Sequence, residues 1–316
     1  MTLSLLLACA ASKDPAPAVA TESAGAETVP EPQYLTPYGF WGLNGFTSEA
    51  ALSDLRGRLH MTLVQTATTD PTYALRQLFP MARASGVKIT LRMTGDHEHY
   101  TLEGSFNLEL WQKRLDLWDG ADLSAYIADG TFAGHMLVDD VLNWPGADPT
   151  GEELEAMASY SQAKFPGLPT FVRERASRIP VPTSGRFTVV DGCVNQYKAK
   201  DGDLQTFIED DRSAAERLGL GTINGMNIAD GGDGSSGQPG WTDGKWAMSA
   251  AEITEYGTAL AAVPELSMFL NWEYDAEEPW SDGTLGAEYF ARPELESALA
   301  DLGRLVGEHP AVALRP

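Results

Sequence analysis

The sequence predicts a single (β/α)8 barrel, and three features of the chain support this fold. From Tyr34 onward, short apolar runs alternate with amphipathic segments, a pattern typical of β-α-β units on a parallel sheet. Eight strand candidates and about as many helix candidates match the composition of such a barrel. The first strand candidate is followed by Asn44-Gly-Phe-Thr47, which lacks the glycine pattern of a dinucleotide-binding sheet, and the chain contains no P-loop.

The strand candidates are the short runs rich in apolar residues that lie between the helical patterns. They are Tyr38–Asn44, His60–Thr66, Val87–Met93, His135–Asp140, Pro169–Glu174, Phe187–Asp191, Thr222–Asn227 and Ser267–Glu273. The helix candidates are Thr47–Arg58, Pro71–Ala84, Asn107–Leu117, Gly151–Lys164, Asp203–Leu218, Ser249–Ala262 and Pro293–Gly307, the last with proline at its start. A chain of 316 residues is long enough for one such barrel.

The chain is strongly acidic, with 22 Lys and Arg against 45 Asp and Glu and a formal net charge of −23. Such a surface repels nucleic acid and anionic membranes and favours neutral or cationic ligands, so we expect no nucleic-acid partner. A soluble extracellular or salt-adapted surface explains the same charge without any role in binding. Beyond the N-terminus, no apolar run is long enough to span a membrane.

The first nine residues resemble the end of a bacterial lipoprotein signal, because Leu6-Leu-Ala-Cys9 is similar to a lipobox. This resemblance implies lipidation of Cys9, a location in the cell envelope or outside the cell, and membrane contact through that anchor alone. The apolar run is short and follows no basic residue, so a chance apolar N-terminus is the alternative. Residues 10–33 have the composition of a disordered linker, and residues 34–316 are expected to form the barrel.

Polar residues cluster at the predicted carboxyl ends of the strands, where barrel enzymes carry their active sites. The strongest signal is the apolar strand in Gly134–Trp144, which ends on the adjacent carboxylates Asp139 and Asp140. A charged pair at the end of an apolar strand is costly unless partners or chemistry hold it there. The other strand ends supply Trp41, Asn44, Gln65, Arg92, Glu174, Asp191, Gln196, Tyr197, Asn224, Asn227, Trp272 and Glu273.

These residue types match a sugar site. Trp and Tyr faces stack on pyranose rings, amides and Arg bind hydroxyls, and two carboxyl groups can cleave a glycosidic bond. We expect Asp140 and Asp191 to be the catalytic pair, with Glu273 and Glu174 in reserve and Asp139 as an orienting neighbour. Strand alternation implies that at most one of Asp139 and Asp140 points into the pocket.

Each of these carboxylates also has a structural interpretation. Asp139 or Asp140 could pair with Arg92 on the neighbouring strand. Glu174 could pair with one of the arginines on either side of it, and Asp191 could cap a turn before Gly192.

Other chemistries have weaker support in the sequence. There is no GxSxG nucleophile elbow, and Cys193 has no evident His partner. His97 and His99 form an HxH pair that could hold a metal, but the other His residues lie at strand starts or in the C-terminal tail. The loop Asp230–Gly237 lacks the bidentate Glu of an EF-hand and is interpreted as a lid over the pocket. We therefore expect no metal and no cofactor.

The chain resembles glycoside-hydrolase-like (β/α)8 barrels of bacterial lipoproteins and secreted proteins of unassigned function. The resemblance rests on Gly134-His-Met-Leu-Val-Asp-Asp140, Val190-Asp191 with Asn195-Gln-Tyr197, Gly225-Met-Asn227 with Asp230-Gly-Gly232, and Asn271-Trp-Glu-Tyr-Asp275. It implies a hydrolase of poly- or oligosaccharides. We expect the protein to be a monomer. Many such barrels carry a Glu nucleophile on strand seven, where this chain has Asn224 and Asn227. The clan that includes the α-galactosidases instead uses Asp on strands four and six, which is similar to Asp139 or Asp140 with Asp191.

Two other functions stay open at this point. One is a barrel that binds glycans without cleaving them, because folds are reused without their chemistry. The other is a metal-dependent barrel hydrolase, in which His97 and His99 would converge on acidic residues.

Overall fold

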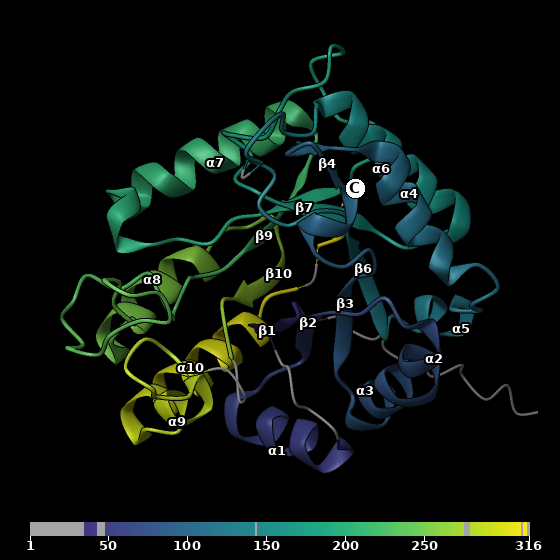
Figure 1. Cartoon of the computed structure of the whole chain (residues 1–316). Coiled ribbons are helices and arrows are strands. Elements are labelled where there is room, and N and C mark those ends of the chain that lie inside the picture. Colours follow the sequence, from purple (N-terminus) through teal and green to yellow (C-terminus); the bar gives the residue numbers. More distant parts are fainter. Residues whose placement is uncertain (1–34, 43–47, 143, 275–278, 311, 315–316) are drawn as a thin grey trace, which may run out of the picture. The chain divides into compact units, whose positions relative to one another are not determined.

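The computed structural model describes residues 35–42, 48–142, 144–274, 279–310 and 312–314. In this part of the chain eight parallel strands form a closed barrel with helices outside it, which confirms the predicted (β/α)8 fold (Figure 1). Around the barrel the order is β1, β2, β3, β6, β7, β8, β9 and β10, and β10 pairs with β1. The signal-like segment with Cys9, the linker at residues 10–33, and Asn44 lie outside the described residues.

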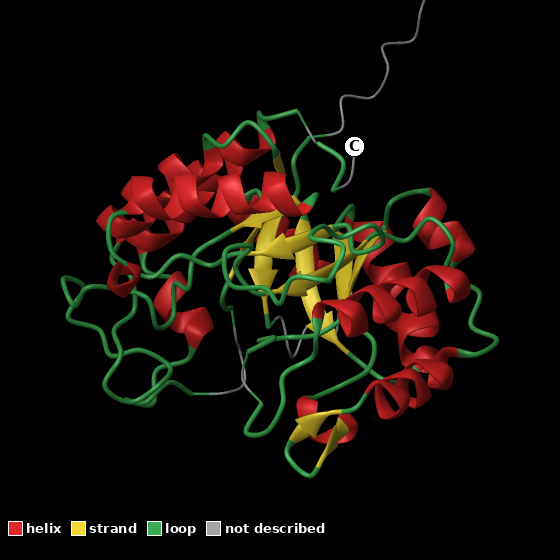
Figure 2. Ribbon diagram, turned by 90° about the horizontal axis from the view of Figure 1, so that it is seen from above, coloured by secondary structure: helices red, strands yellow, loops and turns green. Residues whose placement is uncertain are grey.

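The barrel strands are short, and each is followed by a loop that leads to the outer helices. They are β1 (Tyr38–Trp41), β2 (Leu63–Ala67), β3 (Lys88–Arg92), β6 (Phe132–Met136), β7 (Thr170–Arg173), β8 (Gly192–Val194), β9 (Gly221–Asn224) and β10 (Leu266–Asn271). A separate antiparallel hairpin of β4 (Thr101–Leu102) and β5 (Ser105–Phe106) follows β3 (Figure 2).

The seven predicted helices lie close to their expected positions. The helices are α1 (Glu49–Leu59), α2 (Pro71–Tyr73), α3 (Phe79–Ser85), α4 (Leu108–Leu115), α5 (Ser124–Ala128), α6 (Gly151–Lys164), α7 (Leu204–Leu218), α8 (Ala250–Ala261), α9 (Gly286–Phe290) and α10 (Pro293–Gly307). The short helices α5 and α9 were not predicted. A π-helical segment joins α2 to α3. Capping boxes at Thr150 with Glu153 and at Ser249 with Glu252 start α6 and α8, because they satisfy the first free N–H groups. No helix in the described ranges is both long and apolar enough to cross a membrane.

One predicted strand is wrong. We expected Phe187–Asp191 to be the sixth barrel strand, but the strand is β8 at Gly192–Val194, so Asp191 precedes it. The backbone N–H groups of Val189 and Val190 donate to the Glu155 carboxylate of α6, at 2.8 and 2.9 Å. A side chain of a neighbouring helix therefore takes the donors that a strand would have used, and this segment runs as a loop at the opposite end of the barrel.

The barrel interior is a small apolar core with a polar layer above it. Its buried side chains are Leu63, Met136, Phe171, Val194, Ile223, Met268, Leu270 and Leu314. Leu314 comes from the chain end and closes the barrel at the amino ends of the strands. It fits because residue 221 is glycine: a Cβ there would lie 1.9 Å from the Leu314 carbonyl oxygen. Residues two positions further along each strand share the inward face and lie nearer the carboxyl ends.

Candidate active site

A cavity of about 510 Å³ opens at the carboxyl ends of the barrel strands. Its wall comes from the segments that follow β6 to β10, which the barrel brings together although they are far apart in sequence. The lining residues are Asp139, Asp140, Arg173, Glu174, Arg175, Arg178, Val194, Gln196, Lys198, Lys200, Asp201, Asn227, Asp230, Trp241 and Trp272. The cavity thus has the size and position of a barrel active site.

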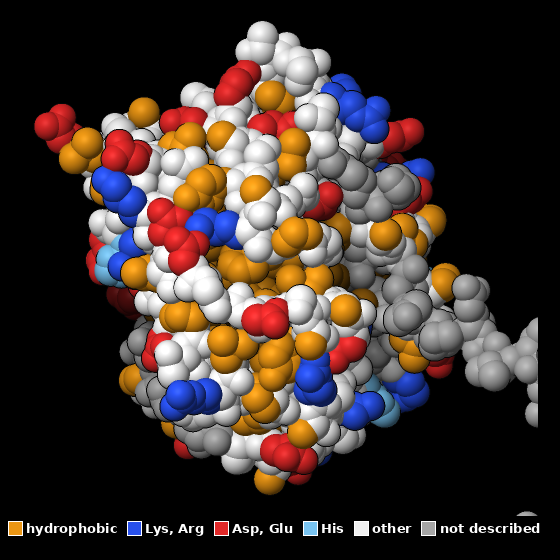
Figure 3. Space-filling model, turned by 90° about the vertical axis from the view of Figure 1, so that its right-hand side faces the viewer, with side chains coloured by type: hydrophobic (Ala, Val, Ile, Leu, Met, Phe, Trp, Pro, Cys, Tyr) orange, Lys and Arg blue, Asp and Glu red, His pale blue; other side chains and the backbone are white. Residues whose placement is uncertain are grey.

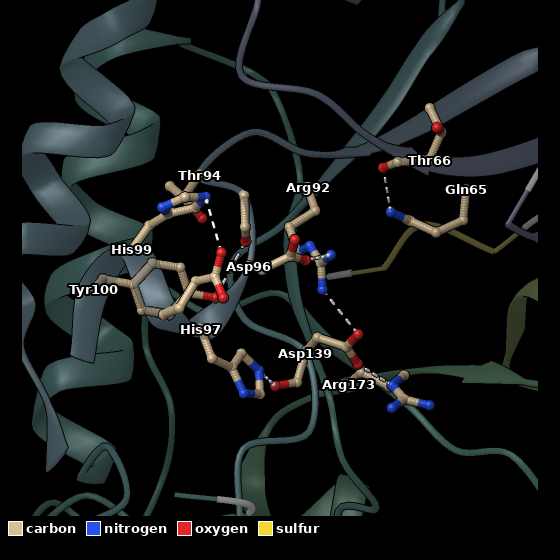
Figure 4. A network of polar contacts seen from close by, with 12 residues as sticks. Gln65, Thr66, Arg92, Thr94, Asp96, His97, His99, Tyr100, Asp139 and Arg173 are labelled. Carbon is tan, nitrogen blue, oxygen red and sulfur yellow. Dashed lines mark hydrogen bonds and ion pairs between the residues drawn. The ribbon is translucent and has the colours of Figure 1, made fainter. Parts of the chain in front are cut away.

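Arg173, the last residue of β7, is the centre of the polar network at this rim. Its guanidinium forms ion pairs with the carboxylates of both Asp139 and Asp140. Asp139 also accepts a hydrogen bond from Arg92, the last residue of β3, at 2.9 Å (Figure 4). This confirms that one member of the acidic pair binds Arg92. The burial of Arg173 lowers its pKa, but the charges of Asp139 and Asp140 outweigh that effect and raise it.

Asp139 and Asp140 differ in how far they are enclosed. The Asp139 side chain is 16% exposed between two guanidinium groups, whereas that of Asp140 is 42% exposed. Both line the cavity, and the expectation that at most one of them points straight into it stays a prediction. Strand alternation does not govern this pair, because strand β6 has ended and Asp140 has a left-handed backbone with φ of 45°. Asp140 is the accessible member and Asp139 the enclosed one.

Glu174, next to Arg173 on the rim, is a carboxyl group of a different kind. Burial raises its pKa above the ordinary value of 4.5, and the nearby Asp140 charge acts in the same direction. The backbone N–H of Arg175, which donates to Glu174 at 3.0 Å, and the guanidinium of Arg178 at 3.5 Å oppose that shift without cancelling it. Glu174 therefore keeps its proton to a higher pH than an exposed glutamate.

Indole rings lie among these charges. Trp272, just after β10, lines the cavity, and the Trp241 ring meets it edge to face, with centroids 5.4 Å apart. Trp41 at the end of β1 lies under the Arg173 guanidinium, 5.4 Å from its ring centroid, in a cation–π contact. Trp241 is 38% exposed. Together with Trp272 it offers apolar faces to a ligand in the cavity.

Several other predicted binding residues lie at or just below this cavity. Gln196 accepts a hydrogen bond from Arg173 at 3.1 Å. Asn227 lines the wall and holds the turn at Asp230 through a 2.7 Å bond from the Asp230 N–H. Gln65 is buried inside the barrel on β2, where its side-chain nitrogen donates to the Thr66 carbonyl at 2.8 Å. Gln65 therefore belongs to the polar layer inside the barrel and not to the wall of the cavity.

Asp191, which we expected to be catalytic, lies at the wrong end of the barrel. It precedes β8 and accepts hydrogen bonds from the backbone and side chain of Thr170, the first residue of β7, at 2.8 and 3.1 Å. It also accepts one from Gln162 of α6 at 3.1 Å. It lines a separate cavity of about 470 Å³ among the strand starts and residues 312–314. Asp191 therefore cannot share a substrate with Asp140.

Two further predicted residues point away from the site. Asn224 donates to the Leu260 carbonyl of α8 at 3.0 Å. Tyr197 packs on Phe207 and donates from its hydroxyl to the Gly202 carbonyl at 2.6 Å. Asn224 occupies an outward position of β9, since its neighbour Ile223 faces the barrel interior. Tyr197 lies beyond β8, next to the cavity residue Gln196, and neither Tyr197 nor Asn224 lines the cavity, so the predicted contact of either residue with a ligand there is wrong.

Glu273 lies beside the cavity and is not among its lining residues. It follows Trp272, is 8% exposed, and its carboxylate occupies the space that a side chain at Gly42 would fill. Gly42 has φ of +77° and follows β1, so Glu273 is held between the ends of β1 and β10. Its catalytic role stays a prediction.

The structure adds site residues that the strand ends did not reveal. Lys198, Arg178, Trp241 and Asp230 all lie in loops, several residues beyond a strand. Trp241 follows the Gly-rich segment interpreted as a lid. A tryptophan next to such a segment is the sequence feature that could have identified it as a site residue. Asp230 accepts from the Thr242 N–H at 2.8 Å and from the Thr242 hydroxyl, which ties the two ends of that loop together.

The HxH pair does not converge with other ligands. Within the described ranges no group of three or more His, Cys, Asp or Glu side chains is placed to hold a metal ion. The Nε2 atom of His97 lies 2.6 Å from the Asp139 carbonyl oxygen (Figure 4). The His97 ring stacks on Trp144 with centroids 4.2 Å apart. His97 therefore supports the loop that carries Asp139.

Comparison with known proteins finds matches to the fold of this chain but none to its sequence. No protein-family model and no curated protein matches its sequence. Solved glycoside-hydrolase barrels match its structure. The family 17 β-1,3-glucanosyltransferase from Rhizomucor miehei is 13% identical, with a TM-score of 0.52 over 79% of this chain and 92% of that one. An active-site mutant of a β-1,3-glucanosyltransferase from the same organism, in complex with laminaritriose, has 13% identity and a TM-score of 0.50 over 82% and 96%.

A bacterial structure gives the same result. The family 30 subfamily 8 xylanase from Clostridium acetobutylicum is 8% identical, with a TM-score of 0.50 over 85% of this chain and 71% of that one. These likenesses confirm the glycoside-hydrolase-like barrel as a fold. At this level of identity they do not transfer an activity or a catalytic residue.

Proposed function

We propose that this chain is a glycoside hydrolase that cleaves a poly- or oligosaccharide in the cavity at the carboxyl ends of the barrel strands. The observation that carries the proposal is the pair of unlike carboxyl groups there. Glu174 is partly buried with a raised pKa, while Asp140 faces the positive charge of Arg173. Environments that separate two carboxyl groups in this way assign one as acid and the other as base or nucleophile.

In this mechanism the protonated Glu174 donates its proton to the glycosidic oxygen as the bond to the anomeric carbon breaks. The ionised Asp140 stabilises the positive charge that develops on the sugar ring. It then either bonds to the anomeric carbon or takes a proton from the attacking water. Asp139, enclosed by Arg92 and Arg173, fixes the arginine that orients Asp140. The indole faces of Trp241 and Trp272 would stack on the sugar rings.

This assignment replaces the pair first predicted. Asp140 keeps its role, Glu174 moves from reserve to acid, and Asp191 is removed because it lies at the other end of the barrel. The test is a glycan hydrolysis panel with Glu174→Gln, Asp140→Asn and Asp191→Asn in the full chain. The proposal requires that the first two variants lose activity and that Asp191→Asn retains it.

One observation favours a second function, a barrel that binds glycans without cleaving them. Asp140 forms an ion pair with Arg173, and a carboxylate engaged in this way is a weaker nucleophile and base. Such a barrel would bind sugars through Trp241 and Trp272 with measurable affinity and no turnover. Saturable glycan binding together with no hydrolysis across the panel would favour it.

The proposal also includes an envelope location, supported by the lipobox-like Leu6-Leu-Ala-Cys9. Lipidation of Cys9 would tether the barrel to a membrane through residues 10–33. The test is incorporation of labelled fatty acid into the chain expressed in a bacterium, with Cys9→Ala as the comparison. Equal incorporation by both proteins would refute the anchor.

A further inference from the structure

The cavity holds an unusual share of the positive charge of an acidic chain. Five of the 22 Lys and Arg residues line it, namely Arg173, Arg175, Arg178, Lys198 and Lys200. Five acidic residues line it as well, although in the whole chain acidic residues outnumber basic ones 45 to 22. On the face drawn in Figure 3, by contrast, Asp and Glu side chains lie dispersed among apolar and basic ones.

Most of these cavity charges already have partners in the protein. Arg173 holds Asp139 and Asp140, and Arg178 lies 3.5 Å from Glu174. Arg175 is directed outward: its guanidinium lies 4.0 Å from the Phe207 ring centroid, with the buried Asp211 at 3.9 Å. The acidic side chains are likewise engaged, and Asp201 accepts from the Lys198 N–H at 3.1 Å.

Lys198 and Lys200 are different. The described residues supply neither of them with an ion-pair partner, yet Lys198 is half-buried in the cavity wall. Burial lowers the pKa of Lys198, the positive charges of Lys200 and Arg173 lower it further, and the charges of Asp140 and Asp201 oppose this shift without cancelling it. Because no described carboxylate forms an ion pair with this half-buried ammonium group, a ligand anion would offset part of its desolvation cost.

We infer that the substrate of this site is a glycan that carries an anionic group on one of its sugars, and that Lys198, with Lys200 beside it, binds that group. This inference rests on the proposed glycosidase function. The shared chemistry is a single negative charge on a sugar ring, either the carboxylate of a uronic acid or a sulfate ester. Lys198 acts here as a binding and specificity residue, beyond the carboxyl groups that perform the cleavage.

The net charge of the whole chain also limits how densely charged the substrate glycan can be. A net charge of −23 repels a dense polyanion, and the repulsion extends over a screening length of about 10 Å at 0.1 M salt. A largely neutral glycan with isolated acidic sugars meets much less of this repulsion while still offering one anion to Lys198. The site therefore favours sparsely charged glycans over polyuronates and heavily sulfated chains.

The test compares matched substrates with the full chain. Oligosaccharides that carry one uronic acid are paired with their carboxyl-reduced forms, and singly sulfated ones with their desulfated forms. We expect kcat/KM about tenfold higher for the charged member of at least one pair, and the pair that shows it identifies the anion. Lys198→Ala should abolish that preference by lowering kcat/KM on the charged member alone. Lys113→Ala, the same charge change on exposed α4, should leave it intact.

Thermal unfolding adds a second readout, because burial disfavours the charged form of Lys198 and no ion pair with a described residue compensates for it. Lys198→Ala should unfold at the wild-type temperature or above it. Equal hydrolysis of charged and neutral members would overturn the anionic inference and leave the glycosidase proposal standing. Binding of the charged member that depends on Lys198, with no hydrolysis of any glycan, would refute the glycosidase and support the anion site. Absence of both binding and hydrolysis would overturn both.

Discussion

The guanidinium of Arg173 forms an ion pair with the carboxylate of Asp139, and this contact joins the ends of two neighbouring barrel strands. The backbone places the two groups together, since the Arg173 N–H donates to the Val138 carbonyl oxygen at 3.1 Å. The same guanidinium reaches Asp140, so one arginine fixes both acidic residues at the rim. The geometry of the proposed site depends on this arginine.

Replacement of Arg173 by Gln should impair catalysis and stability together. The change removes the positive charge that Asp139 and Asp140 share, and breaking a largely buried ion pair costs about 3–5 kcal/mol. We expect kcat to fall by about 10²-fold, because the carboxylates lose their orientation. The control is Arg212→Gln, which removes an exposed arginine paired with Glu265. Similar kcat losses in both variants would refute the orienting role.

Glu174→Gln should abolish hydrolysis, and the wild-type pH profile should report the raised pKa of Glu174. The acid is active when protonated, so kcat should fall as pH rises through that pKa, which lies above 4.5. A basic limb that is unchanged when Glu174 is replaced by Asp would show that another group supplies the proton.

The same raised pKa predicts how stability changes with pH. The folded state binds the Glu174 proton more tightly than the unfolded state does, so the stability that this proton contributes is complete below pH 4.5. It is lost as pH rises through the folded pKa. Glu174→Gln should therefore melt above wild type at pH 7 and should match wild type near pH 4. A lower melting temperature at pH 7 would contradict the burial argument.

Asp191→Asn should lower the stability of the protein and leave its activity nearly unchanged. Asp191 accepts three hydrogen bonds that tie the start of β7 to α6, and its loss should cost about 1–3 kcal/mol of unfolding free energy. It lies away from the cavity, so kcat/KM at 25 °C should stay within twofold of wild type. Asp140→Asn should give the opposite result, with activity lost and stability nearly kept. Denaturant unfolding and steady-state kinetics on the two variants measure these opposite effects on stability and activity.

Trp241→Ala should raise KM more than it lowers kcat. Its ring meets Trp272 edge to face at the cavity, and loss of an aromatic contact surface costs about 1.4 kcal/mol, or roughly tenfold in binding. Trp246→Ala is the matched control, because Trp246 is 42% exposed in the same loop and does not line the cavity. If both variants bind the glycan equally well, the stacking surface lies elsewhere.

Much of the fold could be predicted because local patterns and tertiary structure agree. The helices α6 and α10 match their predicted bounds, and the alternation of strands and helices leads directly to the barrel. The missed strand shows the limit of this approach. Phe187–Asp191 has the composition of a strand, but Glu155, a side chain about 30 residues earlier, captures its N–H groups. No local pattern reports such a long-range acceptor.

The site could be predicted in part for a related reason. Strand alternation separates Ile223, which faces inward, from Asn224, which faces outward, but it applies only where the strand is correctly positioned. Beyond the strand ends the backbone is irregular, as at Asp140 with its positive φ. The raised pKa that selects Glu174 arises mainly from burial, which depends on the assembled rim.

The central claim is that Glu174 and Asp140 cleave a glycosidic bond in this cavity, and a hydrolysis assay with chemical rescue tests it most directly. Full-length wild type and the Asp140→Gly and Glu174→Gly variants would be assayed on the glycan panel, with and without added azide or formate. We expect hydrolysis by wild type, loss of about 10³-fold or more in both variants, and partial recovery with the small anion in at least one. Wild-type rates in both variants, with correct folding, would contradict this claim.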